Sequence, residues 1–188
     1  MATFRHNTAN LISVPLTFMN LLLKKVIYPR NLFFSPIERF SPNVVVDLDR
    51  KSELRFGKKI SAHSGCRLTA NNGGRLTVDD HTSFNVGCIV TCRNKISVGK
   101  NVAFGPNVMI YDHNHILDRM NGATTSDYSL GVIEIGDNTW IGANTVILSN
   151  TRIGKNCVIA AGSVVKGDVP DNTVLIQKRT NTYKRIEV

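Results

Sequence analysis

The chain has 188 residues, with 23 Lys and Arg against 14 Asp and Glu and a formal net charge of +9 at pH 7. That length suits one domain with a core large enough to fold without disulfide bonds. The positive charge favours a phosphate-bearing small molecule, another polyanion or a membrane surface as partner. No zinc-finger spacing or RNA-binding aromatic run is present in the sequence, which argues against nucleic acid.

An N-terminal helix is the first predicted element. Its large apolar residues fall on one helical stripe, which consists of Leu16, Met19, Leu23, Val26 and Ile27. Lys24 and Lys25 lie in the last turn. We expect this stripe to pack on the protein's own core or on a partner subunit. The alternative is a weak contact with a membrane surface, which would place the protein peripherally at the inner membrane face.

Residues 29–51 contain three prolines and predict an irregular connector that ends in a short strand near 44–48. The apolar run 11–23 is too short to span a bilayer and has no Ala-x-Ala cleavage site, so we expect a cytoplasmic protein. The four cysteines lack the spacing of a metal site and predict buried thiols in a reducing compartment. Residues 1–51 are therefore expected to form a helix and connector that precede the main fold.

Residues 52–172 repeat with a period of six. From Ile135 the chain reads IGDNTW, IGANTV, ILSNTR, IGKNCV, IAAGSV, VKGDVP, with an aliphatic first residue and often Asn or Asp in fourth place. This period is neither helical nor a plain strand alternation, but it suits a three-sided coil whose turns stack on one another. The inward positions should form ladders, with Ile135 on Ile153, Ile141 on Ile159 and Ile147 on Val165. Asn suits the corners because it tolerates left-handed backbone angles.

The period is interrupted twice. Two extra residues are expected to bulge out around Asn94 and Lys95, and the chain leaves the coil between Ile110 and Ile135. The second interruption is an excursion loop, residues 111–133, that carries His113 and His115. Loops that leave a rigid scaffold often carry function, so the excursion is the predicted site.

The run IEIGDNTWIGANTVILSNTRIGKNCVIAAGSVVKGDVPDN, and residues 52–172 as a whole, resemble the left-handed parallel β-helix acyltransferases built on hexapeptide repeats. The likeness is greatest to galactoside and maltose acetyltransferases and to sugar O-acetyltransferases of bacterial surface-polysaccharide clusters. It implies an all-β fold, a homotrimer, and acetyl-coenzyme A bound in a groove between subunits. The left hand follows from the resemblance alone, because the general rule for parallel crossovers favours the right hand. Residues 173–188 form a basic tail outside it.

Transfer of an acetyl group to a hydroxyl requires a base, because an alcohol is a weak nucleophile at neutral pH. Histidine titrates in the right range, and the resemblance places the catalytic histidine at His115. We expect His113 to orient that base, to bind the acceptor or to replace His115. Asp112 is expected to bind substrate or to fix an imidazole tautomer. Asn85 is implied to line the site, although a polar outer residue of a strand is an equally simple interpretation.

The resemblance also implies a set of coenzyme contacts: Trp140, Ala143, Ala161, Lys166, Lys178 and Arg179. Trp140 would lie beside the pantetheine arm or only pack, and the backbone at Ala143 and Ala161 would contact the oxyanion and the arm. Lys166 is displaced by one position from the Thr-Lys pair of the family. The tail lacks the family's Gly-x-Pro turn, so its phosphate ligand stays open among Lys178, Arg179, Lys184 and Arg185.

Together these residues predict an O-acetyltransferase that uses acetyl-coenzyme A and no metal. Its acceptor would be a saccharide hydroxyl, free, nucleotide-linked or lipid-linked, in bacterial surface-polysaccharide biosynthesis, with direct transfer in a ternary complex. An antibiotic or amino-sugar N-acetyltransferase of the same fold is one alternative. A metalloenzyme like the gamma-class carbonic anhydrases, with His81, His113 and His115 as zinc ligands, is another. The third is a binding β-helix without catalysis.

Overall fold

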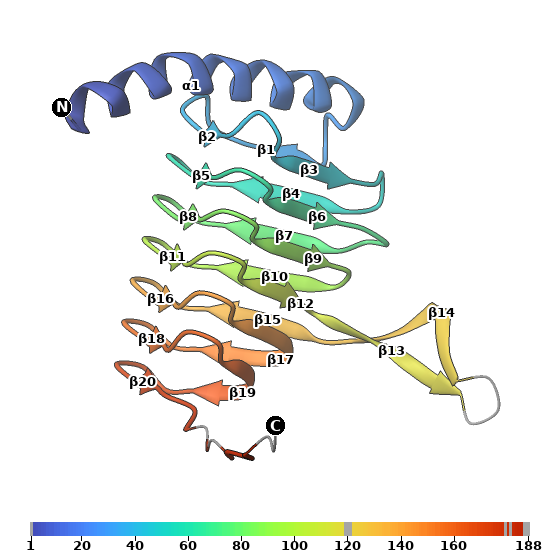
Figure 1. The fold of residues 1–188 in the computed structure, drawn as a ribbon. Helices are drawn as coiled ribbons and strands as arrows, with labels where there is room; N and C mark the ends of the chain where they lie inside the picture. Colours follow the sequence, from blue (N-terminus) through green and yellow to red (C-terminus); the bar gives the residue numbers. More distant parts are fainter. Residues whose placement is uncertain (1, 119–121, 179, 181, 186–188) are drawn as a thin grey trace.

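The computed structural model describes residues 2–118, 122–178, 180 and 182–185 and is a parallel β-solenoid (Figure 1). A helix, α1 (Ala2–Ile27), lies across one end, and a two-stranded hairpin projects from the side. The predicted fold class, a left-handed parallel β-helix with an N-terminal helix and an excursion, is confirmed. The helix is longer than expected, because it runs over 26 residues rather than a short segment.

The solenoid has three faces, and each turn adds one strand to each face. Face 1 contains β1 (Leu32–Phe33), β4 (Glu53–Phe56), β7 (Arg75–Val78), β10 (Lys95–Val98) and β15 (Val132–Ile135). Face 2 contains β2 (Arg39–Phe40), β5 (Ser61–Ala62), β8 (Ser83–Phe84), β11 (Ala103–Phe104), β16 (Trp140–Ile141), β18 (Val158–Ile159) and β20 (Val174–Leu175). Face 3 contains β3 (Val45–Leu48), β6 (Arg67–Ala70), β9 (Ile89–Cys92) and β12 (Met109–Tyr111). Two longer strands, β17 (Val146–Ile153) and β19 (Val164–Val169), begin on face 3 and end on face 1.

The predicted inward ladders are present. Ile135 pairs with Ile153, Ile141 with Ile159, and Ile147 with Val165, and all six side chains are buried. The core extends beyond these ladders to the stacked rings of Phe84 and Phe104, whose centroids are 4.7 Å apart. The four cysteines, Cys66, Cys88, Cys92 and Cys157, are free and buried, as predicted. Aliphatic burial in every turn is the main stabilising contribution in such a coil.

Asparagines form the corners between faces 1 and 2. Asn101, Asn138, Asn156 and Asn172 adopt left-handed φ values between 54° and 57°. Each side-chain amide donates to the next one along the corner, with N···O distances of 3.0, 3.3 and 3.0 Å. The predicted role of Asn in the repeat is therefore confirmed, and stacking adds a side-chain ladder that the pattern alone did not indicate.

The solenoid begins earlier than the sequence analysis expected. β1, β2 and β3 pair in parallel with β4, β5 and β6, so residues 32–48 form a first turn rather than an irregular connector. Pro36 and Pro42 occupy corners of this turn and Pro29 lies between α1 and β1, while Leu32, Phe40 and Val46 point into the core. At the other end, β20 pairs with β18 and extends the coil past residue 172 into the segment assigned to the tail.

The orientation of α1 differs from the first expectation. Thr17 and Leu21 face the solenoid and are buried, and the Thr17 hydroxyl exchanges hydrogen bonds with the Phe40 backbone. The predicted docking stripe instead faces away and is exposed: Leu16 53%, Met19 56%, Leu23 62%, Val26 75% and Ile27 61%. The apolar period was correct, but the side of the helix that packs on the coil is the opposite one. Across the described residues, no helix combines the length and apolar character that crossing a membrane requires.

Candidate functional site

The excursion is an antiparallel hairpin that leaves the solenoid at the edge between faces 3 and 1. Its strands are β13 (His113–Asp118) and β14 (Gly122–Leu130), inserted between β12 and β15. After the hairpin, β15 returns to pair with β10 above and β17 below. The predicted departure from the coil is confirmed, and the expected loop is mostly strand (Figure 1).

Asp112 anchors the base of the hairpin. Its side chain is completely buried, and its carboxylate accepts the backbone N–H groups of Arg93 (2.9 Å) and Asn94 (2.8 Å). Extra residues were predicted around Asn94 and Lys95; Arg93 and Asn94 form a corner that this carboxylate stabilises, whereas Lys95 is the first residue of β10. Asp112 was expected to bind substrate or to fix an imidazole tautomer. Its complete burial argues against direct contact with an acceptor, whereas its place beside His113 suits the second role.

His113 lies directly against this carboxylate. Its Nδ1 is 3.1 Å from Asp112 Oδ1, and its side chain is 10% exposed. The imidazole meets Tyr111 and Tyr128 edge-on, with ring centroids 6.3 and 5.2 Å away. Hydrogen bonding to a carboxylate fixes the orientation of an imidazole ring. His113 is therefore the imidazole that Asp112 orients.

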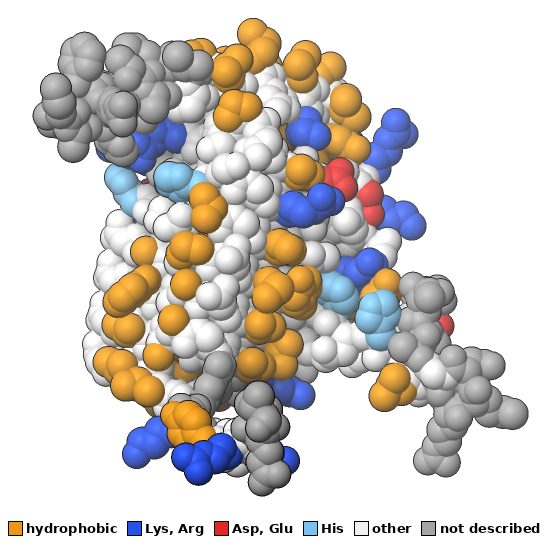
Figure 2. All heavy atoms as spheres, viewed as in Figure 1, with side chains coloured by type: hydrophobic (Ala, Val, Ile, Leu, Met, Phe, Trp, Pro, Cys, Tyr) orange, Lys and Arg blue, Asp and Glu red, His pale blue; other side chains and the backbone are white. Residues whose placement is uncertain are grey.

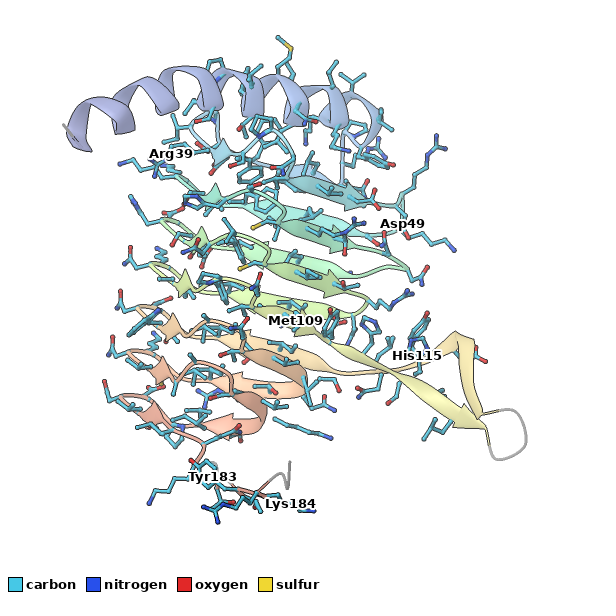
Figure 3. All side chains as sticks on the ribbon, viewed as in Figure 1. Arg39, Asp49, Met109, His115, Tyr183 and Lys184 are labelled. Carbon is cyan, nitrogen blue, oxygen red and sulfur yellow. The ribbon has the colours of Figure 1, made fainter. Side chains whose placement is uncertain are left out.

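His115, two residues further along β13, is exposed. It pairs with Tyr128 across the hairpin, and the two rings lie 4.8 Å apart at an angle of 50°. Figure 3 shows His115 at the root of the hairpin, beside the face that carries Met109. An exposed imidazole held on a rigid strand can accept a proton from a group that approaches from solvent.

Two residues of this cluster were not predicted from the sequence. Tyr128 contacts both histidine rings, and the guanidinium of Arg93 lies over its ring, with Cζ 3.9 Å from the ring centroid. Within the described part of the chain, Arg93 Nε is buried without a hydrogen-bond partner. The hairpin register brings Tyr128 beside His115, and no repeat pattern encodes that register.

A second set of predicted residues lies along a different edge, between faces 2 and 3. Asn85 follows β8, Ala143 follows β16 and Ala161 follows β18. Asn85 is exposed, and its Oδ1 accepts the N–H of Val86 at 2.8 Å. Trp140, the first residue of β16, is 57% exposed.

This edge is built for close stacking. A Cβ on Gly142 would lie 2.5 Å from the backbone nitrogen of Ala161, which is too close for any side chain. The N–H of Gly162 donates to the carbonyl of Ala143 at 2.7 Å. Small residues at this edge therefore allow successive turns to stack closely.

The basic residues expected at the coenzyme phosphates are spread over the lower turns. Lys166 is exposed on β19, at the same edge as the hairpin, and Lys178 is exposed beyond β20. Tyr183 and Lys184 lie below the last turn (Figure 3). Arg179 lies outside the described residues. Within one chain, the structure places the histidines and Lys166 on one side of face 3 and Asn85, Trp140, Ala143 and Ala161 on the other.

Neither a zinc site nor a thiol nucleophile is assembled in the described part of the chain. His81 lies at the corner between faces 1 and 2, away from His113 and His115, and no group of three or more metal-ligating side chains occurs among the described residues. Burial, and then the charge of Asp112, raise the pKa of the Cys92 thiol far above its usual range. A neutral buried thiol is a poor nucleophile.

Comparison with known proteins finds similarity to transferases over part of the chain. Residues 133–167 match the family model for bacterial transferase hexapeptide (six repeats). Galactoside O-acetyltransferase of Lactococcus lactis is 44% identical over 79 residues, which cover 42% of this chain and 38% of that enzyme. The "Putative lipopolysaccharide biosynthesis O-acetyl transferase WbbJ" of Escherichia coli K12 is 28% identical over 130 residues, 65% of this chain and 66% of that protein.

A solved structure shares the fold over most of the chain. A variant of AntD, an N-acyltransferase from Bacillus cereus solved with dTDP-4-amino-4,6-dideoxyglucose and coenzyme A, aligns over 87% of this chain and 88% of its own. The TM-score is 0.64 and the sequence identity 15%, a likeness of fold alone. The chain spans about half the length of two curated relatives that it matches, the "Putative acetyltransferase YJL218W" of Saccharomyces cerevisiae and the "Putative acetyltransferase C18B11.09c" of Schizosaccharomyces pombe.

Proposed function

Since residues 133–167 match the hexapeptide-repeat transferase family model, we propose that the chain belongs to this family and transfers the acetyl group of acetyl-coenzyme A to a hydroxyl of a saccharide. The observation that carries this proposal is His115, exposed on a hairpin that the coil supports through the buried Asp112. The names of the galactoside and lipopolysaccharide relatives support a saccharide acceptor. A surface polysaccharide is the destination that we propose.

In the proposed reaction, the role of the protein side chains is to transfer one proton. His115 accepts the proton of the acceptor hydroxyl as the oxygen bonds to the thioester carbonyl carbon, and the protonated imidazole then gives it to the departing thiolate. The coenzyme supplies only the activated acetyl group. Direct transfer is favoured because all four cysteines are buried, so no exposed thiol could carry the acetyl group.

The residues that would hold acetyl-coenzyme A fit a long flexible arm. Trp140 offers an exposed apolar ring, and the small residues Ala143 and Ala161 allow close approach to the backbone. Lys166 and Lys178 are exposed cations suited to phosphate. Backbone amides near Ala143 are candidates to stabilise the oxyanion.

We propose that a complete site forms between two copies of the chain. The histidines lie at one edge of face 3, whereas Trp140, Ala143 and Ala161 lie at the other, so we propose that a second copy brings its own edge to the hairpin. An outward apolar column on face 3, made of Ile89, Met109, Val146 and Val164, supports such packing. We propose a homotrimer, which the mass of the protein in solution by light scattering would test.

The function is tested by the release of coenzyme A thiol from acetyl-coenzyme A across a panel of galactosides, sugar nucleotides and oligosaccharides. His115→Ala should lower kcat by two or more orders of magnitude and leave coenzyme affinity unchanged. His81→Asn is the matched control. It changes a histidine at a distant corner, where the backbone has a left-handed φ, and asparagine tolerates that conformation. Normal turnover by His115→Ala would remove His115 from the role of base, and no acceptor-dependent thiol release would refute the proposed activity.

A further inference from the structure

The exposed stripe of α1 lies on the outer part of the helix, and three of its residues also border a groove between the helix and the first turn. Successive residues of a helix are rotated by about 100°, which places Leu16, Met19, Leu23, Val26 and Ile27 within about 60° of the direction opposite the buried Leu21. Each of the five is more than half exposed. Figure 2 shows apolar side chains along this end of the molecule, where α1 lies in Figure 1. A helix that packs with one side and presents a second apolar side outward needs something to cover it.

A groove continues the stripe onto the first turn. It lies between α1 and the coil and has a volume of about 290 Å³. Leu16, Met19 and Leu23 line it from the helix, and Phe40, Pro42 and Val44 line it from the coil. The apolar surface is therefore broader than a single helix edge, and it lies at the end of the solenoid opposite β20.

The charge of the end of the molecule that carries α1 favours a negatively charged partner. The first 37 residues contain no Asp or Glu, and Glu38, the first acid, is buried. Lys25 points inward, where Nζ donates to the Leu32 carbonyl at 2.6 Å and lies over the Phe33 ring. Lys24 is partly exposed and Arg30 is exposed, so both can meet negative groups near the end of the helix.

From this arrangement we propose that α1 lies flat on an anionic lipid bilayer. Its outward stripe enters the boundary of the acyl chains, and the groove beside it accommodates part of one chain. Apolar burial combined with attraction between basic residues and anionic headgroups is how interfacial helices bind. The inference rests on α1 and the first turn alone and does not depend on acetyl transfer.

The test is co-sedimentation of the full chain with vesicles. Vesicles of phosphatidylcholine with phosphatidylglycerol should bind it, and pure phosphatidylcholine or 0.5 M salt should weaken binding several-fold. The triple variant Leu16→Gln, Met19→Gln, Leu23→Gln should bind at least tenfold more weakly. It removes no buried side chain and keeps good helix formers, so its circular dichroism and melting temperature should match those of the native protein.

The matched control carries Val174→Gln and Ile176→Gln, which change residues that are 61% and 68% exposed at the opposite end of the coil. This variant should bind vesicles like the native protein. The proposal would be overturned if the native protein did not sediment with anionic vesicles, or if the control lost as much binding as the triple variant. It would also be overturned if, without lipid, the native protein formed particles whose mass is a multiple of that of the triple variant. The last result would show that another copy covers the stripe.

Discussion

The carboxylate of Asp112 joins one turn of the coil to the first residue of the hairpin, with Oδ1 3.1 Å from Nδ1 of His113. The same group accepts two backbone N–H bonds from the corner at Arg93 and Asn94. A single buried acid therefore fixes both the corner and the imidazole. The position of His115, two residues beyond, depends on this anchor.

Replacing this acid tests the anchor. Asp112→Asn keeps the size of the side chain but brings an amide NH₂ toward the two backbone donors, so we expect a clear loss of stability. Loss of an orienting partner typically lowers activity about 10- to 100-fold. Melting temperature and kcat should both fall, whereas Asp47→Asn, an exposed change on β3, should leave both near native. Unchanged kcat in Asp112→Asn would show that His113 needs no orientation.

The ring of Tyr128 is predicted to hold the histidine pair. Tyr128→Phe preserves the contacts with His113, His115 and Arg93, so kcat should stay within a few-fold of native. Tyr128→Ala removes the ring and the cation–π contact, which is worth about 0.5–1 kcal/mol at such a site, and kcat should fall about tenfold or more. Steady-state kinetics of the two variants show whether the ring or the hydroxyl of Tyr128 is needed. If Tyr128→Phe lowers kcat as much as Tyr128→Ala does, the hydroxyl rather than the ring supports the histidine pair.

The asparagine corner allows backbone and side-chain effects to be separated. Asn138 has φ 57° and bonds to Asn101 and Asn156. Asn138→Gly loses the amide ladder but keeps the left-handed backbone, whereas Asn138→Ala also pays about 1–2 kcal/mol for that conformation. Urea unfolding should rank native above Gly and Gly above Ala. Equal stability of the Gly and Ala variants would contradict this explanation of Asn in the repeat.

The buried Glu38 predicts a pH dependence of stability. Burial raises its pKa from 4.5 to about 7, although its carboxylate accepts the N–H groups of Ile60 and Ser35. Because the folded protein holds this proton more tightly than the unfolded chain, its contribution to the unfolding free energy is greatest below pH 4.5. That contribution is lost as the pH rises to about 7, by an amount on the order of 1–3 kcal/mol.

Glu38→Gln should therefore flatten the pH dependence of the unfolding free energy between pH 4.5 and 7. Glu134→Gln, which changes an exposed carboxylate 3.9 Å from Lys95, is the control and should keep the native slope. Urea titrations at several pH values measure both. An unchanged slope in Glu38→Gln would mean that another group carries the dependence.

Much of the coil could be predicted because each hexad alone indicates which of its residues points inward and which forms the corner. Every hexad marks its own inward residue and corner, so the Ile135, Ile141 and Ile147 ladders could be assigned without knowledge of the rest of the fold. The first turn was missed because its prolines and irregular spacing hide the same inward positions. The apolar period of α1 showed that a stripe exists, but a period alone does not state which way the stripe faces.

The candidate site was predicted only in part, for a different reason. His113 and His115 could be found because they lie where the period stops. Arg93 and Tyr128 join them through the pairing of an irregular hairpin and the corner of the previous turn, and these are contacts between distant segments with no repeat to reveal them. Asp112 was noticed for its charge, but its burial depends on the turn above.

The hairpin also bears on how such a protein can change over evolutionary time. Gly131 donates its N–H to the carbonyl of Asp112 at 2.7 Å, so the inserted strands close on themselves at a single corner. The pairing of β15 with β10 and β17 is unaffected by what lies between. Insertions, deletions and substitutions beyond the base of the hairpin can accordingly accumulate while the scaffold stays stable, so the surface that the hairpin presents can change without rebuilding the fold.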